Sequence, residues 1–213
     1  NFNSFDVTSV ASTGLGFNAS ANGFSTISPG AMTLIKTLTA SSSANLSFVD
    51  GSDSVVLDNT YPIYLFKFIN MHPATDSALF QVNFRDGGSS YDATKTSTYF
   101  YAQHGEDGNN GELVYSGTYD LAQSTSAQSI SEIAGNANDE SISGELFLFN
   151  PSSTTFVKHY MSQTNTYIPS NRSTKVHVDG YCNVTAAIDG VQFSMSSGNI
   201  DAGTIKLYGI KDS

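Results

Sequence analysis

Short apolar stretches with a two-residue period recur along most of the chain, separated by clusters of Gly, Asn, Asp and Ser. In segment 78–85 the alternate residues Phe80, Val82 and Phe84 are apolar, and the residues between them are polar. Successive side chains of a β-strand point to opposite faces, so this period predicts a strand that buries one face. Similar stretches predict about ten or eleven strands between Ala31 and Lys211.

Segment 61–70 differs because apolar residues occupy both of its faces. One face would carry Ile63, Leu65 and Ile69, and the other face three aromatic residues. This pattern predicts a central strand that is covered on both sides.

Strands at this spacing, without intervening helices, predict an all-β fold: an antiparallel two-sheet β-sandwich, jelly-roll-like, spanning residues 31–213. Helical evidence is confined to segment 126–141, which could hold one short helical turn or be a loop. The core is expected to include Leu65, Phe66, Phe80, Val82, Leu146, Leu148, Phe193, Ile205 and Leu207.

Residues 1–30 have a different composition, in which small polar residues dominate and single Phe residues recur. We interpret this segment as an extended N-terminal arm that packs on a partner or on the sandwich domain, and a disordered leader is the alternative. Its partner-binding anchors are expected to be Phe2, Phe5, Phe17 and Phe24.

The overall charge narrows the range of partners. The chain has 213 residues, of which 13% are charged, and a formal net charge of −10. Such a surface repels phosphate backbones, so nucleic-acid binding is not expected. No apolar run approaches the length of a membrane span, and no signal peptide is recognisable. The single cysteine, Cys182, excludes an intramolecular disulfide and a zinc site built on thiolates, and is expected to be a small buried residue.

Candidate chemistry is sparse. Loop His104–Glu112 combines carboxylates with glycines, which suits calcium, but it does not match the calcium-loop spacing and is equally a solvated hairpin tip. Asp139 and Glu140 are adjacent; if they lie in a strand, they would point to opposite faces and could not act as a catalytic pair. The chain has no nucleophile elbow, P-loop or dinucleotide motif. We therefore assign no catalytic, cofactor-binding or metal residue and predict that the protein is not an enzyme.

Three segments carry a resemblance to a known family: residues 61–84, residues 146–160 and residues 186–211, the last containing "SMSSGNIDAGTIKLYGIK". Over about residues 31–211 the chain resembles structural proteins encoded by marine tailed phages, including cyanophages. The resemblance implies a virion component, either a capsid decoration protein or a fibre or appendage head, that binds other virion proteins. Residues 1–30 fall outside it.

Other functions remain open at this level. A receptor- or glycan-binding module at a fibre tip would use the polar loops His104–Glu112 and Ser162–Ser173. A polysaccharide-degrading enzyme is a further alternative. Open edge strands need protection, and these strands hold only scattered lysines such as Lys36, Lys67 and Lys158. We therefore expect a homo-oligomer, with trimeric symmetry expected by analogy with phage appendages.

Overall fold

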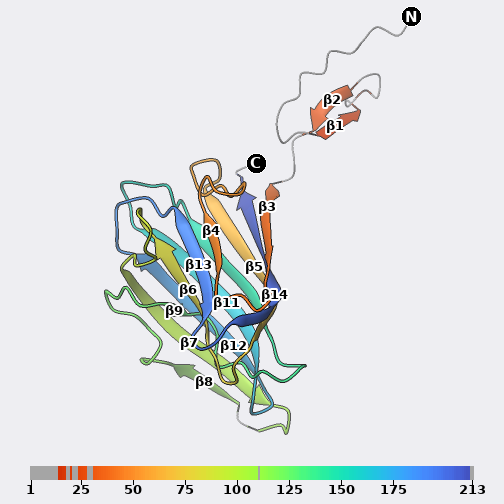
Figure 1. The fold of residues 1–213 in the computed structure, drawn as a ribbon, viewed down its shortest axis with the longest axis vertical. Helices are drawn as coiled ribbons and strands as arrows, with labels where there is room; N and C mark the ends of the chain where they lie inside the picture. The colour runs from red at the N-terminus through yellow and green to blue at the C-terminus, as the bar shows by residue number, and fades with distance from the viewer. Residues whose placement is uncertain (1–13, 18–19, 21–23, 28–30, 110, 212–213) are drawn as a thin grey trace, which may run out of the picture.

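The computed structural model describes residues 14–17, 20, 24–27, 31–109 and 111–211. These residues form strands and loops, with no helix among them. Twelve strands build two sheets that pack face to face (Figure 1), and all described pairings are antiparallel. The predicted all-β, two-sheet sandwich is therefore confirmed, and its classification as a jelly roll stays a prediction.

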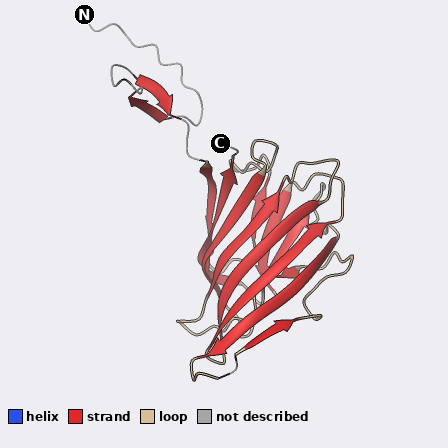
Figure 2. Cartoon of the chain, turned by 180° about the vertical axis from the view of Figure 1, so that it is seen from behind, coloured by secondary structure: helices blue, strands red, loops and turns tan. Residues whose placement is uncertain are grey.

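The larger sheet has eight strands, which Figure 2 shows from the side opposite to Figure 1. In spatial order they are β3 (Met32–Thr39), β14 (Ile200–Ile210), β5 (Ile63–Pro73), β10 (Ile142–Phe149), β11 (Lys158–Ile168), β12 (Arg172–Cys182), β7 (Lys95–Gly105) and β8 (Glu112–Tyr115). Strands β3 and β8 are its two edges.

The smaller sheet has four strands and lies in front of the larger one in Figure 1. Its order is β4 (Leu46–Val49), β13 (Gly190–Met195), β6 (Phe80–Arg85) and β9 (Gln128–Ser129). Strand β9 is the only regular element within segment 126–141, which is otherwise a loop.

The core forms between the two sheets from alternate residues of each strand. At its centre, Phe48, Phe66, Phe68, Phe80 and Phe193 pack with their rings mostly edge to face. This geometry is favourable for aromatic pairs because the positive edge of one ring meets the negative face of another.

All nine predicted core residues are buried. Leu65 differs from the other eight, because it lies outside the cluster that forms between the sheets. On β5 its neighbours Tyr64 and Phe66 point into that cluster. Alternation along a strand therefore places Leu65 on the opposite, outer face of the eight-stranded sheet.

Strands β1 (Gly14–Phe17) and β2 (Phe24–Ile27) form a separate antiparallel pair, with Phe17 opposite Phe24. The side chains of these strands, and Phe2 and Phe5, lie outside the described residues. The interpretation of residues 1–30 as a partner-binding arm stays a prediction.

Candidate functional site

The outer face of the eight-stranded sheet carries an apolar stripe. Figure 2 looks onto this face, and no described strand lies in front of it. On β5 the outward residues include Leu65, which is 4% exposed, and Ile69, which is 42% exposed. The prediction that segment 61–70 is covered on both sides is therefore wrong for the described structure. Leu65 is shielded by neighbouring side chains of the same sheet and not by a second layer of strands.

Strand register arranges the stripe in two rows of directly opposed residues. The first row runs Leu34, Tyr208, Leu65, Phe147 and Met161 across five strands, from β3 to β11. The second row runs Met32, Ile210, Ile63 and Phe149 across four strands. Opposed residues of paired strands project from the same side of a sheet and contact one another. We call these nine residues the outer apolar face.

Exposure is greatest at the two ends of this face. Met32 is 52% exposed, Leu34 51% and Met161 49%, whereas Leu65 in the middle is almost fully buried. Met32 and Leu34 lie on the edge strand β3, which has a neighbour on one side only among the described strands. Their apolar atoms stay in water because no adjacent side chain covers them.

An apolar hollow of about 320 Å³ continues the face toward β12 and β7. Met161 belongs both to the first row and to the wall of this hollow, which Thr98, His159 and Tyr181 also line. His159 and Tyr181 are directly opposed across β11 and β12, and their rings are 6.0 Å apart. The stripe and the hollow are therefore one continuous apolar surface.

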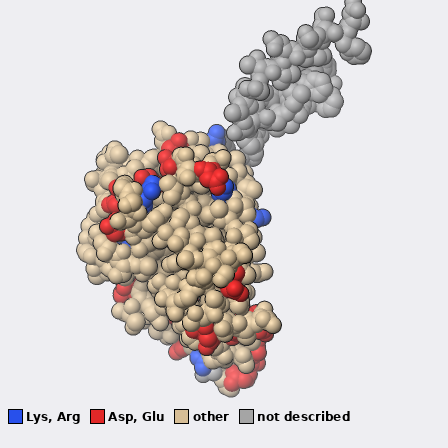
Figure 3. Space-filling view, in the orientation of Figure 1, with Lys and Arg blue, Asp and Glu red and all other residues tan. Residues whose placement is uncertain are grey.

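Charged residues border the outer apolar face without entering its two rows. The next row across the sheet contains Lys206, Lys67 and Glu145, and the last two form an ion pair. On the opposite side of the sandwich, Figure 3 shows carboxylates gathered near the two ends, with few charges between them. Asp179 on β12 lies directly opposite Met161 and lines the hollow, so one carboxylate borders this end of the face.

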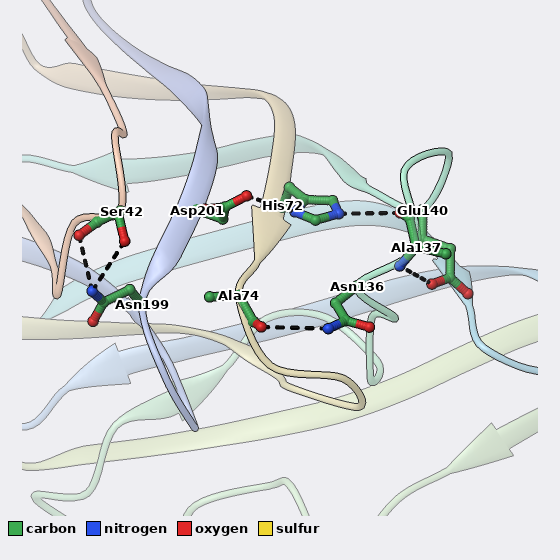
Figure 4. A network of polar contacts seen from close by, with 8 residues as sticks. All are labelled: Ser42, His72, Ala74, Asn136, Ala137, Glu140, Asn199 and Asp201. Carbon is green, nitrogen blue, oxygen red and sulfur yellow. Dashed lines mark hydrogen bonds and ion pairs between the residues drawn. The ribbon is translucent and has the colours of Figure 1, made fainter.

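A polar hollow of about 430 Å³ lies at the other end of β5 and β14, beside loop 136–141 (Figure 4). His72 is central to it: its Nε2 donates to the carbonyl oxygen of Ala137 at 3.1 Å, and its Nδ1 is 3.6 Å from Asp201 Oδ2. Asn70 and Asp139 also line the hollow. This arrangement offers donors and acceptors for a polar ligand.

The adjacent carboxylates in this loop have separate surroundings. The buried Glu140 accepts a hydrogen bond from the backbone N–H of Ala137 at 2.8 Å and so closes its own turn, whereas Asp139 is exposed at the hollow. The structure does not arrange them as a catalytic pair.

The carboxylates of loop His104–Glu112 are likewise engaged locally. Asp107 accepts the backbone N–H of Asn109 at 3.0 Å, and this hydrogen bond lowers the pKa of the Asp107 carboxyl. Glu112 accepts a hydrogen bond from Gln103 of the opposed strand. Among the described residues, no group of three or more His, Cys, Asp or Glu is arranged to hold a metal ion.

Two lysines lie between the sheets, where the alternation pattern did not distinguish them from surface residues. Lys95 and Lys158 are fully buried, and register places one on each side of the buried Cys182. The Lys95 ammonium donates to Asn83 Oδ1 at 2.6 Å and to the carbonyl oxygen of Ala93 at 2.9 Å. Lys158 therefore faces the interior, so it is not available to protect a strand edge.

Burial lowers the pKa of Lys95 to about 8, below the ordinary 10.5. Between these two pH values the unfolded chain binds more protons, so folding is favoured as pH rises. We expect the wild type to gain on the order of 1–3 kcal/mol over a Lys95→Met variant between about pH 7 and about pH 10. Urea denaturation of both proteins across this range measures the difference, and a pH-independent difference contradicts it.

The matched variant also isolates the contribution of Lys95. Burial raises the pKa of Cys182 to about 12, so its ionisation in the unfolded chain destabilises the fold as pH rises above 9.0. This opposing effect is shared by the two proteins and largely cancels in the comparison.

Sequence reasoning missed the outer apolar face as an open surface, although its signal was present. The outward residues Ile63, Leu65, Phe147 and Phe149 repeat with a two-residue period on two strands. The candidate anchors Phe17 and Phe24 are opposed in the β1–β2 pair, and no other candidate anchor lies within the described residues.

The described residues contain no helix of the length and apolarity that a membrane span requires. Comparison with known proteins found no family model, no curated protein and no solved structure that matches this chain.

Proposed function

We propose that the protein is a structural component of a phage virion, either a capsid decoration protein or a fibre or appendage head, that binds other virion proteins. The observation that carries the proposal is the outer apolar face, a continuous apolar surface that no described strand covers. The resemblance of residues 31–211 to virion structural proteins of marine tailed phages supports the same assignment.

The physical chemistry of the face fits protein binding. Large contiguous apolar patches on a soluble domain mark interaction surfaces, because their exposure to water is unfavourable unless a partner covers them. Fully burying one large apolar side chain contributes about 1.5–3 kcal/mol. Met32, Leu34 and Met161 are about half exposed. Covering them with a partner would therefore release a substantial part of this burial free energy.

The role in the particle can be tested directly. Mass spectrometry of purified virions should detect the chain as a particle component, and a particle map should show a β-sandwich with its eight-stranded sheet against a neighbour. Absence of the chain from purified particles refutes the proposal.

Self-association is part of the proposal. The edge strand β3 has eight residues and only one charged side chain, so charge gives its open edge little protection. We propose a homo-oligomer, with trimeric symmetry by analogy with phage appendages.

Residues 1–30 are proposed to be the attachment element. Four buried Phe side chains would contribute about 1.5–3 kcal/mol each, which does not offset about 1–2 kcal/mol of backbone entropy per ordered residue. The arm must therefore also form backbone hydrogen bonds, most simply as an added strand.

Deleting residues 1–30 is expected to leave a folded, soluble sandwich that no longer joins the particle. The described core and the residues packed against it all lie at position 35 or later, so the deletion removes none of them. Circular dichroism checks folding, and virion mass spectrometry checks incorporation. Normal incorporation of the truncated chain would assign attachment to the sandwich itself.

A second candidate function is binding of a receptor glycan at a fibre tip. The observation that favours it is the polar hollow, where Asn70, His72, Asp139 and Asp201 present polar groups to solvent. A glycan array with the wild type and an Asp201→Ala variant tests this. Signal that Asp201→Ala removes supports glycan binding, and no signal from the wild type counts against it.

A further inference from the structure

The two edges of the eight-stranded sheet differ in how open they are to pairing with a further strand. At one edge, β8 has four residues and includes Glu112, so it is short and carries a charge. At the other edge, β3 has eight residues, and its single charged side chain, Lys36, is engaged by Asp53. Natural proteins protect edges by shortness and by charge. Each edge carries one charged side chain that is engaged within the chain, so length is the difference that leaves β3 more open to pairing.

The exposure of the first apolar row indicates the same edge. Leu65 is 4% exposed because Tyr208 and Phe147 flank it, whereas Leu34 at the end of the same row is 51% exposed. Met32, at the same edge in the second row, is similarly exposed at 52%. One additional strand beside β3, with apolar residues on its outward face, would place Leu34 and Met32 in the flanked surroundings that Leu65 has.

The chain itself contains a segment with the required properties. Residues 1–13 carry Phe5 and Val7 two positions apart, so both would project from one face of a strand. Asp6 is their only charged residue, which limits repulsion by an acidic partner. A segment of this length reaches up to about 45 Å when extended, and β3 spans about 27 Å.

A strand added at the edge is also the binding mode that backbone chemistry favours. A peptide that lay flat across the apolar rows would bury N–H and C=O groups without partners. Beside β3, the same groups would pair with the free edge of that strand.

We propose that residues 1–13 of a neighbouring copy add a strand to the open edge of β3, with Phe5 and Val7 beside Met32 and Leu34. This inference rests on the proposed assembly function, from which the choice of a neighbouring copy follows. The contact joins two different surfaces and is heterologous, so repetition with closure gives a ring such as a trimer.

Cysteine cross-linking of the complete chain tests the contact. One chain carries Asn3→Cys, which in an antiparallel strand would project from the same face as Phe5 and lie near Thr37. The other chain carries Thr37→Cys on β3, and the native Cys182 is buried and unavailable. The control partner carries Thr118→Cys, an exposed threonine in the loop that follows β8 at the other edge of the sheet. After mixing and mild oxidation, the Asn3→Cys and Thr37→Cys pair should form a disulfide-linked dimer on the order of tenfold faster than the Asn3→Cys and Thr118→Cys pair.

The remaining outcomes are equally decisive. Equal rates for the two pairs overturn the contact. A chain carrying both Asn3→Cys and Thr37→Cys that forms only an intramolecular disulfide assigns the edge to its own segment and overturns the neighbouring copy as occupant.

A substitution series provides an independent readout. Leu34→Lys should weaken self-association of the complete chain by about tenfold or more in analytical ultracentrifugation. Leu113→Lys, at a residue that is 74% exposed on the other edge strand, should leave it unchanged. Equal effects of the two substitutions, at unchanged thermal stability, contradict the proposal.

Failure of the contact and failure of the proposed function give different results. Cross-linking between copies with no chain in purified virions would refute the virion role and retain the contact. A chain present in virions without preferential cross-linking would support the virion role and refute the contact.

Discussion

Replacing Phe193 with alanine is expected to lower the free energy of unfolding by about 3–5 kcal/mol. Phe193 is fully buried on β13, and its ring centroid lies 5.1–6.2 Å from those of Phe48, Phe66, Phe68 and Phe80. Truncation would remove four aromatic contacts and leave a cavity between the sheets. Domains are stable by about 5–15 kcal/mol, so this single change removes a large share.

Urea denaturation followed by circular dichroism measures the loss. Phe156→Ala is a matched control, because Phe156 is 71% exposed and its truncation should change stability by about 0.5 kcal/mol or less. A loss below about 1 kcal/mol for Phe193→Ala would show that the core can collapse around the gap.

Substituting Gly144 by alanine is expected to have the second large effect, a destabilisation of about 1–3 kcal/mol or more. A Cβ atom on Gly144 would lie 2.2 Å from the carbonyl oxygen of Gln163 and 2.7 Å from the Cα of Thr164. Both atoms belong to the backbone of the paired strand β11, so no side-chain rotation relieves the contact. The two strands would have to separate locally, which weakens their hydrogen bonds.

Gly117→Ala is the control for this substitution. No heavy atom lies within 4 Å of a Cβ built on Gly117, so this change should be neutral or stabilise by about 0.4–1 kcal/mol. Equal thermal stability of the two variants would mean that β10 and β11 adjust at no detectable free-energy cost.

Much of the fold could be predicted from the sequence because strand alternation is a local property. The burial of β6 alternates residue by residue as segment 78–85 predicts, and Phe80, Val82 and Phe84 are fully buried. Short turn-rich connections and the scarcity of helical patterns also predicted the all-β class.

The interpretation of the second apolar face of β5 could not be settled in the same way. A strand buried between two layers and a strand on a binding surface have the same sequence pattern, since both place apolar residues on two faces. Only the sheet order shows that Leu65 is flanked by Tyr208 and Phe147, and that no described layer covers them.

The polar hollow and the two interior lysines also could not be predicted from the sequence, because both depend on which strands pair. His72, Ala137 and Asp201 come from separate parts of the chain and meet through pairing of β5 with β14 and through loop 136–141. Lys95 and Lys158 are ordinary strand lysines in the sequence.

The sequence by itself determined where most of the strands of the sandwich lie, which strand faces are apolar and that the surface is acidic, since these follow from neighbours along the chain and from composition. Tertiary structure alone decided which apolar face became the core and which stayed open at β3. It also decided that Lys95 and Lys158 lie inside, beside Cys182. These outcomes depend on which strands pair, and pairing joins residues far apart in the chain whose contacts no local period encodes.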